Sequence, residues 1–249
     1  MIDFTAEHLT KGDPSWDKGE IKKETEDLLD ELYDLTKRLY AEGKQGLLII
    51  LQGMDASGKD GLTRTLFSKT SPGWVNVNSF KKPTDEELAH DFLWRVHAHA
   101  PEKGMVGVFN RSHYEDILVP TVYNLFPKEQ IERRYDHINN YETYLEDNGI
   151  KIVKFFLNVS YDKQHEKLME RVENPEKMWK HSDGDWTTRD NWDKFMDVYQ
   201  SVLTRCNEVP WHILPSDKNW TKLYTAAKVV VAKLKEMNPQ FPPLDSEKF

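Results

Sequence analysis

The chain has 249 residues, of which 38% are hydrophobic and 31% are charged, a composition that excludes wholesale disorder. The formal net charge of −8 disfavours a general nucleic-acid-binding role, so a polyanion would need a local cluster of basic residues. A single cysteine, no basic-then-apolar signal pattern and no apolar run near the roughly 18 residues of a membrane span favour a soluble, cytoplasmic protein without membrane contact.

The expected elements alternate between helices and short apolar strands. Residues 1–19 are expected to form an irregular arm, and the apolar spacing over 20–43 predicts a helix that ends at Gly43. Strands are expected at residues 47–52, 74–80, 104–110, 150–160 and 211–215. Further helices are expected at 59–68, 84–100, 128–149, 161–173, 191–207 and 220–237. The alternation predicts one α/β domain over 1–249, with about five parallel strands and helices on both faces of the sheet.

The clearest motif is "GMDASGKDG", residues 53–61, which follows the first predicted strand. Its spacing, between a strand and a helix, is typical of a phosphate-binding loop. The backbone N–H groups of residues 54–60 would face a phosphate at the positive end of the helix dipole, and Lys59 would reach a bridging oxygen. The candidate phosphate- or nucleotide-binding residues in and after this loop are Gly53, Met54, Ala56, Ser57, Gly58, Asp60, Gly61 and Arg64.

Two carboxylates in this loop need an explanation. Asp60 stands where Ser or Thr usually holds Mg²⁺, but a carboxylate in the first turn of a helix is favoured by about 0.3–1 kcal/mol. Asp55 would repel a bound phosphate unless a cation lies between them. We therefore predict that Asp55 is a ligand of Mg²⁺, with Mn²⁺ as a substitute; the alternative is an exposed aspartate in a turn.

A second cluster, "NRSHYED", follows the strand predicted at 104–110. Because ligands of parallel sheets bind at the carboxyl ends of strands, this cluster and the phosphate loop should lie at the same ligand-binding site. Arg111 offers a planar fork to phosphate oxygens. Glu115 and Asp116 are candidates for contact with metal or nucleotide, or alternatively for the N-terminus of a helix. His113 is expected to be a packed side chain rather than a base.

The polar segment of about 171–190 carries interspersed cations that suit a lid over a phosphate chain, with a solvated loop as the alternative. The candidate lid residues are Arg171, Lys180 and Arg189.

Seven segments together resemble the polyphosphate kinase 2 family over residues 20–240: "GMDASGKDG", "SFKKPTDEELAHDFLWR", "GVFNRSHYEDILV", "RRYDHINNYE", "KFFLNVS", "WKHSDGDWTTRDNW" and "PWHILPSDKNW". The resemblance implies Mg²⁺-dependent, reversible transfer of a phosphoryl group from inorganic polyphosphate to AMP or ADP. The sequence leaves open whether guanine nucleotides also serve as acceptors. It also implies a P-loop kinase-like three-layer fold, a helical lid and a homo-oligomer, either dimer or tetramer. "NRSHYED" is similar to the subgroup that uses both AMP and ADP.

By the family pattern, the catalytic residues are Asp55, Lys59 and Arg111, and Glu115 falls at the position that marks the subgroup. Lys81 and Arg134 fall in segments expected to contact phosphate. The resemblance also implies that polyphosphate meets the loop while the nucleotide lies by the lid and Glu115.

The residues alone leave two other functions open. One is a nucleoside monophosphate kinase with ATP as donor, for which the loop and lid fit equally well. The other is a sensor that binds nucleotide or polyphosphate without turnover, although simple anion binding gains nothing from Asp55.

Overall fold

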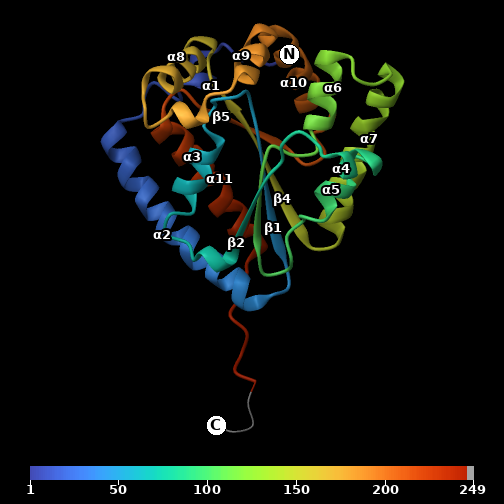
Figure 1. Ribbon diagram of the computed structural model, residues 1–249. Coiled ribbons are helices and arrows are strands. Elements are labelled where there is room, and N and C mark those ends of the chain that lie inside the picture. The colour runs from blue at the N-terminus through green and yellow to red at the C-terminus, as the bar shows by residue number, and fades with distance from the viewer. Residues whose placement is uncertain (246–249) are drawn as a thin grey trace.

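A computed structural model describes residues 1–245, and its centre is a sheet of five parallel strands (Figure 1). The strands are β1 (Gly46–Gln52), β2 (Val75–Ser79), β3 (Val106–Asn110), β4 (Ile150–Asn158) and β5 (Trp211–Pro215). Their order is β2-β3-β1-β4-β5, and every neighbouring pair is parallel. The predicted α/β fold with a parallel sheet is therefore confirmed.

Eleven α-helices and two short 3₁₀ turns connect the strands within residues 1–245. The helices are α1 (Glu7–Thr10), α2 (Lys18–Glu42), α3 (Lys59–Leu66), α4 (Asp85–Ala89), α5 (Trp94–His97), α6 (Glu115–Tyr123), α7 (Lys128–Asp147), α8 (Tyr161–Glu173), α9 (Asp183–Asp190), α10 (Trp192–Arg205) and α11 (Asn219–Met237). The 3₁₀ turns are η1 (Pro72–Trp74) and η2 (Met178–Lys180). No helix in this part of the chain is long and apolar enough to cross a membrane.

The central strands β1, β3 and β4 are buried on both faces of the sheet, and β1 shows why its sequence is a continuous apolar run. Side chains alternate along a strand, so Leu48 and Ile50 join the core formed with α6, α7 and α10. Leu47, Ile49 and Leu51 join the core formed with α2, α3 and α11. A central strand of a three-layer fold therefore needs apolar residues at every position, as the sequence analysis assumed.

The helix predicted over residues 84–100 is wrong as a single element. Its start is correct, because Thr84 and Glu87 form a capping box in which each side chain accepts from the other's N–H. The chain then leaves the helix at His90 and begins a new turn at Asp91, whose Oδ1 accepts from the N–H of Leu93 at 3.0 Å. A local side-chain hydrogen bond thus outweighs the helical spacing and separates α4 from α5.

Two helices are expected only indirectly from the sequence. The apolar spacing predicts no helix for residues 111–127, although one alternative puts Glu115 and Asp116 at a helix N-terminus; α6 runs through this segment with Pro120 inside it. For the polar segment of about 171–190, only the family resemblance implies a helix; α9 forms there, and Ser182 caps its N-terminus. The arm of residues 1–19 is mostly irregular as expected, but it contains α1 and the first two residues of α2.

The topology brings the two predicted clusters together. β1 and β3 are neighbours in register, with Leu51 opposite Asn110, and the N–H of Arg111 donates to the carbonyl of Leu51 at 3.0 Å. The phosphate loop after β1 and the cluster after β3 therefore leave the sheet side by side at its carboxyl edge.

Candidate active site

The phosphate loop, defined here as residues 53–60, takes the predicted strand–loop–helix form. Gly53 and Gly58 have φ of 145° and 96°, and a Cβ on Gly53 would lie 2.6 Å from the carbonyl oxygen of Leu157. Only glycine fits such a conformation at such a close approach. Ala56 also has a left-handed φ, of 60°. The loop therefore turns tightly enough to leave its N–H groups at the start of α3.

The side chain of Lys59 lies inside the phosphate loop and links its two ends. Its Nζ donates to the carbonyl of Gly53 at 2.7 Å and to that of Met54 at 3.2 Å, and the residue is 8% exposed. Burial, together with the charge of Arg111, lowers the pKa of Lys59 to about 8. The amine is thus poorly hydrated and gains charge stabilisation when an anion enters the loop.

Asp55 is paired with Arg111 by a hydrogen bond between Oδ1 and Nη2. Burial alone would raise the pKa of Asp55, but the charges of Arg111 and Lys59 outweigh it and hold that pKa below its usual value. Arg111 has a left-handed φ of 62°, which costs energy for a residue other than glycine. The turn after β3 therefore aims Arg111 at the loop, and Arg111 is the cation that compensates Asp55 in this structure.

Asp60 lies in the first turn of α3, as predicted, and also has a partner that the sequence analysis did not name. The side-chain N–H of Asn110 donates to Asp60 Oδ1. An aspartate at the end of β3 would place a second carboxylate against Asp60. The contact explains why asparagine stands at residue 110.

Glu115 and Asp116 begin α6, so their placement at a helix N-terminus is confirmed. Burial raises the pKa of Glu115, although the charges of Arg111 and Lys59 oppose this shift, so its carboxylate is close enough to be affected by the cations of the phosphate loop. Asp116 Oδ2 accepts from Arg95 Nη2 at 3.1 Å, and its backbone carbonyl accepts from Arg134. Consecutive residues of α6 therefore serve two different environments.

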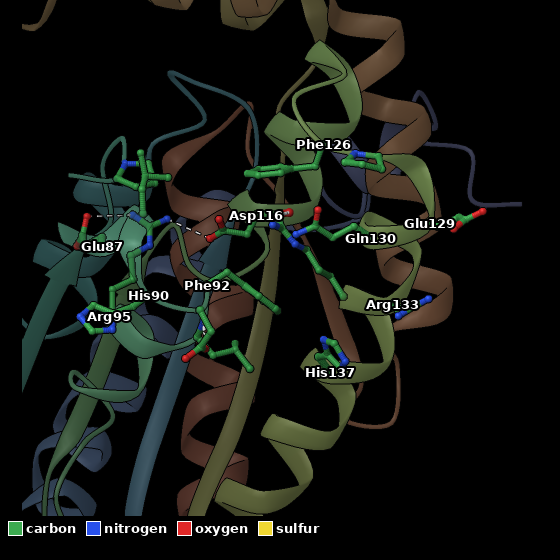
Figure 2. A pocket seen from close by; sticks show the side chains of 16 residues that line it. Glu87, His90, Phe92, Arg95, Asp116, Phe126, Glu129, Gln130, Arg133 and His137 are labelled. Carbon is green, nitrogen blue, oxygen red and sulfur yellow. Dashed lines mark hydrogen bonds and ion pairs between the residues drawn. The ribbon is translucent and has the colours of Figure 1, made fainter. Parts of the chain in front are cut away.

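The second environment is a cavity of about 580 Å³, here named the α4–α7 pocket (Figure 2). It is lined by residues between Pro83 and Arg95, by Asp116, and by residues between Phe126 and His137. The Arg134 guanidinium lies over the rings of Phe92 and Phe126, 5.0 and 4.5 Å from their centroids. The pocket thus combines aromatic surface with cations, which suits a ligand that carries both a ring and negative charge.

His113 is a packed side chain, as expected. It is fully buried and its Nε2 lies 3.1 Å from Glu142 Oε1. Glu142 also accepts from Lys154 Nζ at 2.6 Å and from the Tyr114 hydroxyl at 2.6 Å. This buried network supports the turn that carries Arg111, and nothing in the sequence marks Lys154, which is one of two lysines in the mostly apolar strand β4.

The lid candidates differ in their surroundings. Arg189 is 8% exposed and donates to the carbonyl of Tyr161 at 2.8 Å and to Gln164 Oε1 at 2.9 Å. Gln164 in turn donates to the backbone carbonyl of Asp55 at 3.1 Å. Arg189 therefore joins α9 to α8 and, through Gln164, to the loop, rather than presenting its charge to solvent.

The other lid cations are more accessible. Arg171 pairs with Asp185 of α9, whereas Lys180 is exposed and its Nζ lies 4.9 Å from the centre of the Trp179 ring. The phosphate loop also affects Asp185. Burial and the charge of Asp55 raise the pKa of Asp185, whereas the charge of Arg171 lowers it. The α8–α9 segment thus adjoins the phosphate loop.

Two of the three remaining candidates lie outside this cluster. Arg64 is an exposed residue in the last turn of α3, away from the loop's N–H groups. The Lys81 side chain is exposed, and its backbone carbonyl accepts from Arg95 Nη1 at 3.0 Å. Gly61 continues α3 and has open space around its Cα.

A metal site made of protein ligands alone is not present. Within residues 1–245, no group of three or more His, Cys, Asp or Glu side chains is arranged to hold a metal ion. Mg²⁺ commonly binds one or two carboxylates and completes its shell with water and substrate phosphates. The ionised, buried carboxylate of Asp55, with Glu115 in the same cluster, fits that kind of site.

Comparisons with known proteins agree with this geometry. The family model for Polyphosphate kinase 2 (PPK2) matches residues 15–242. The AMP/ADP-polyphosphate phosphotransferase of Meiothermus ruber is 44% identical over 85% of this chain and 80% of its own length. The ADP-polyphosphate phosphotransferase of Rhodopseudomonas palustris is 38% identical over 94% of this chain and 86% of its own.

A solved structure is similar over almost the whole chain. The crystal structure of Polyphosphate Kinase 2 from Arthrobacter aurescens superposes with a TM-score of 0.92 at 36% identity, covering 99% of this chain and 88% of that one.

Proposed function

This chain belongs to the polyphosphate kinase 2 family, and from that premise we propose that it transfers the terminal phosphoryl group of inorganic polyphosphate to AMP and to ADP. The observation that carries the proposal is the pairing of two unlike sites. A buried phosphate loop with Lys59, Asp55 and Arg111 adjoins a separate aromatic and cationic pocket, and α6 supplies Glu115 to one and Asp116 to the other.

The α4–α7 pocket is the proposed acceptor site. Phe92 and Phe126 offer ring surfaces on which a purine base can stack, and Arg134 lies over both rings. The carbonyl of Asp116 accepts from Arg134, so this arginine is held between α7 and the start of α6. A nucleotide in the pocket would extend its phosphates past α6 toward Arg111. This proposal moves the nucleotide away from the lid, where the resemblance placed it.

The reaction requires the protein to position the donor and acceptor and to neutralise their negative charges. The attacking oxygen belongs to a nucleotide phosphate that is already ionised near neutral pH, so no general base has to remove a proton. Lys59 and the N–H groups of the phosphate loop hold phosphates of the donor, and Arg111 bridges the loop and the start of α6. Their charges stabilise the negative charge that spreads over the transferred group.

Mg²⁺ is the proposed metal, and Asp55 is its proposed ligand, with Glu115 as the neighbouring carboxylate. When bound, the ion would neutralise phosphate charge and align donor and acceptor oxygens. Asp55 forms an ion pair with Arg111 in this structure. Arg111 would therefore have to move from Asp55 to a substrate phosphate before Asp55 could bind an ion. Asp55 and Arg111 would thus form a pair that separates when substrate enters.

Conversion of ADP to ATP in the presence of long-chain polyphosphate and Mg²⁺, with no ATP added, tests this function. We expect ATP from ADP, and ADP followed by ATP from AMP, when the products are separated by chromatography. Polyphosphate-independent phosphorylation with ATP as the donor would indicate a nucleoside monophosphate kinase. Binding of polyphosphate and nucleotide without any product would indicate a sensor.

Four further statements stay predictions: guanine nucleotides as additional acceptors, a dimer or tetramer, a cytoplasmic location, and a single domain whose α8–α9 segment closes as a lid.

A further inference from the structure

Two lysines that the proposed reaction does not yet use converge behind the phosphate loop. Lys222 of α11 donates from Nζ to the carbonyl of Ser57 at 3.1 Å, and Lys167 of α8 donates to the carbonyl of Ser216 at 3.3 Å. Both amines point at Gly58: a Cβ on that glycine would lie 2.3 Å from Lys222 Nζ and 3.9 Å from Lys167 Nζ. Two helices far apart in the sequence therefore deliver their charges to one spot on the loop.

These charges lack a counter-ion. Within residues 1–245, neither lysine forms an ion pair with a carboxylate, and each has a main-chain carbonyl as its hydrogen-bond acceptor. Asp217 acts on Lys167 from a distance, but its Oδ1 is held by the N–H of Ser160 at 2.8 Å. An ammonium group has three donors, so both lysines keep unused hydrogen-bonding capacity.

Burial makes this arrangement costly. Lys222 is 2% exposed, whereas Lys167 is half-buried, so Lys167 forms the outer edge of the cluster and Lys222 its floor. Burial and the neighbouring charges of Lys167 and Lys59 lower the pKa of Lys222 to about 7. Proteins retain like charges in such surroundings mainly where a ligand of opposite charge will join them.

We propose that Lys167 and Lys222 form a second phosphate subsite beside Gly58, which binds a phosphate of the polyphosphate chain other than the one that is transferred. The inference rests on the proposed function, because it assigns a path to the donor of that reaction. A chain whose terminal phosphates lie in the loop would pass Lys59 and continue between α8 and α11, where each further phosphate supplies the missing counter-charge.

The chemistry of the subsite favours an inorganic chain over a nucleoside. No aromatic ring in residues 1–245 lies against the amine of Lys167 or Lys222, in contrast to the two rings under Arg134. A purine would gain little from main-chain carbonyls and ammonium groups, whereas a repeating phosphate chain gains a charge-assisted hydrogen bond at every contact. The subsite therefore discriminates between donors by charge rather than by base.

The test compares Lys222→Met and Lys167→Met with Lys233→Met, a matched control on the same helix as Lys222 whose lysine pairs with Glu236. For ATP formation, each of the first two variants should raise the KM for long-chain polyphosphate about tenfold or more and leave the KM for ADP unchanged. Lys222→Met should also unfold at a higher temperature than the wild type, because it removes a buried charge without a partner. A purely structural lysine would give the opposite shift.

Calorimetric binding of tripolyphosphate, measured without turnover, separates the subsite from the proposed function. Weaker binding in both variants but not in Lys233→Met supports the subsite even if the wild type forms no ATP, an outcome that would defeat only the proposed function. Unchanged binding and an unchanged polyphosphate KM in both variants would overturn the inference. A rise in the ADP KM equal to that for polyphosphate would overturn it as well, since the lysines would then serve the nucleotide.

Discussion

The two sides of the proposed active site solve the problem of binding anions in different ways. On the phosphate-loop side, Lys59, Lys167 and Lys222 are held by main-chain carbonyls and are short of carboxylate partners. In the α4–α7 pocket, Arg95 pairs with Asp116, and Arg134 lies over two aromatic rings. On the first side, Asp55 is paired with Arg111, but the three lysines would gain a directly paired counter-charge only from a ligand. The second side offers ring surface. On the proposed function, charge would therefore select the donor and shape would select the acceptor.

The two sides meet at the start of α6. The charges of Arg111 and Lys59 act on Glu115, whereas Asp116 accepts a hydrogen bond from Arg95. Adjacent residues of one helical turn therefore face the proposed donor site and the proposed acceptor site. Removal of charge beside the transferred group should therefore cost more activity than removal of a stacking surface.

The largest expected effect follows from Lys59→Met and Asp55→Ala. Each should lower kcat by about 10²–10³-fold or more, because each removes charge organisation around the transferred phosphoryl group. Initial rates of ATP formation from ADP and polyphosphate measure the loss, and thermal unfolding checks that the fold persists. Near-normal turnover in Asp55→Ala would contradict its role as a metal ligand.

A smaller effect is expected from Phe92→Ala on the other side. Loss of a stacking ring should raise the KM for ADP about 5–100-fold while the KM for polyphosphate stays the same. Phe241→Ala is a matched control, since this exposed phenylalanine lies near Lys37 and Arg38 of α2 rather than in the pocket. An equal rise in both KM values would show that the two sides are not separate.

The pH dependence should distinguish the sides as well. The free protein has lowered pKa values of about 7 for Lys222 and about 8 for Lys59, and a bound polyanion favours the charged amines. Affinity should therefore be greatest below pH 7 and fall as the pH rises. We expect the KM for polyphosphate to increase about tenfold between pH 7 and pH 9 at saturating ADP.

Lys222→Met should remove the lower step and leave a dependence centred near pH 8, where Lys59 loses its proton. A polyphosphate KM that stays flat or decreases over this range would contradict the placement of donor phosphates at these lysines.

The smallest effect is expected from Glu115→Asn, at the point where the sides meet. It should lower kcat/KM for AMP several-fold more than for ADP, because AMP has fewer phosphates with which to bridge the pocket and the loop. Parallel measurements with AMP and ADP at fixed polyphosphate decide this point. Equal losses for both acceptors would remove Glu115 as a residue that distinguishes them.

Much of the fold could be predicted from the sequence because its signals are local and strong. The apolar strands, Gly43 at the end of α2, the capping box at Thr84 and the phosphate-loop spacing all act within a few residues. The break between α4 and α5 could not be predicted, since it depends on a local hydrogen bond in which Asp91 Oδ1 accepts from the N–H of Leu93. α9 could be expected only from the family resemblance, which implies a helical lid, because its composition is that of a polar loop.

The site was predictable where a motif carried it and not where tertiary contact did. Asp55, Lys59 and Arg111 stand in recognisable segments, and the structure brings them together. Lys167 and Lys222 lie in ordinary amphipathic helices, so only their approach to Gly58 reveals them. Arg189 shows the reverse case: a cation in the right segment that the fold uses to join α9 to α8.

The most direct test of the two-sided account is a crossed measurement of both Michaelis constants in Lys222→Met and Phe92→Ala. The account predicts that Lys222→Met raises the KM for polyphosphate alone and that Phe92→Ala raises the KM for ADP alone. A pattern in which either variant raises both constants equally, or in which the two effects are exchanged, would contradict it.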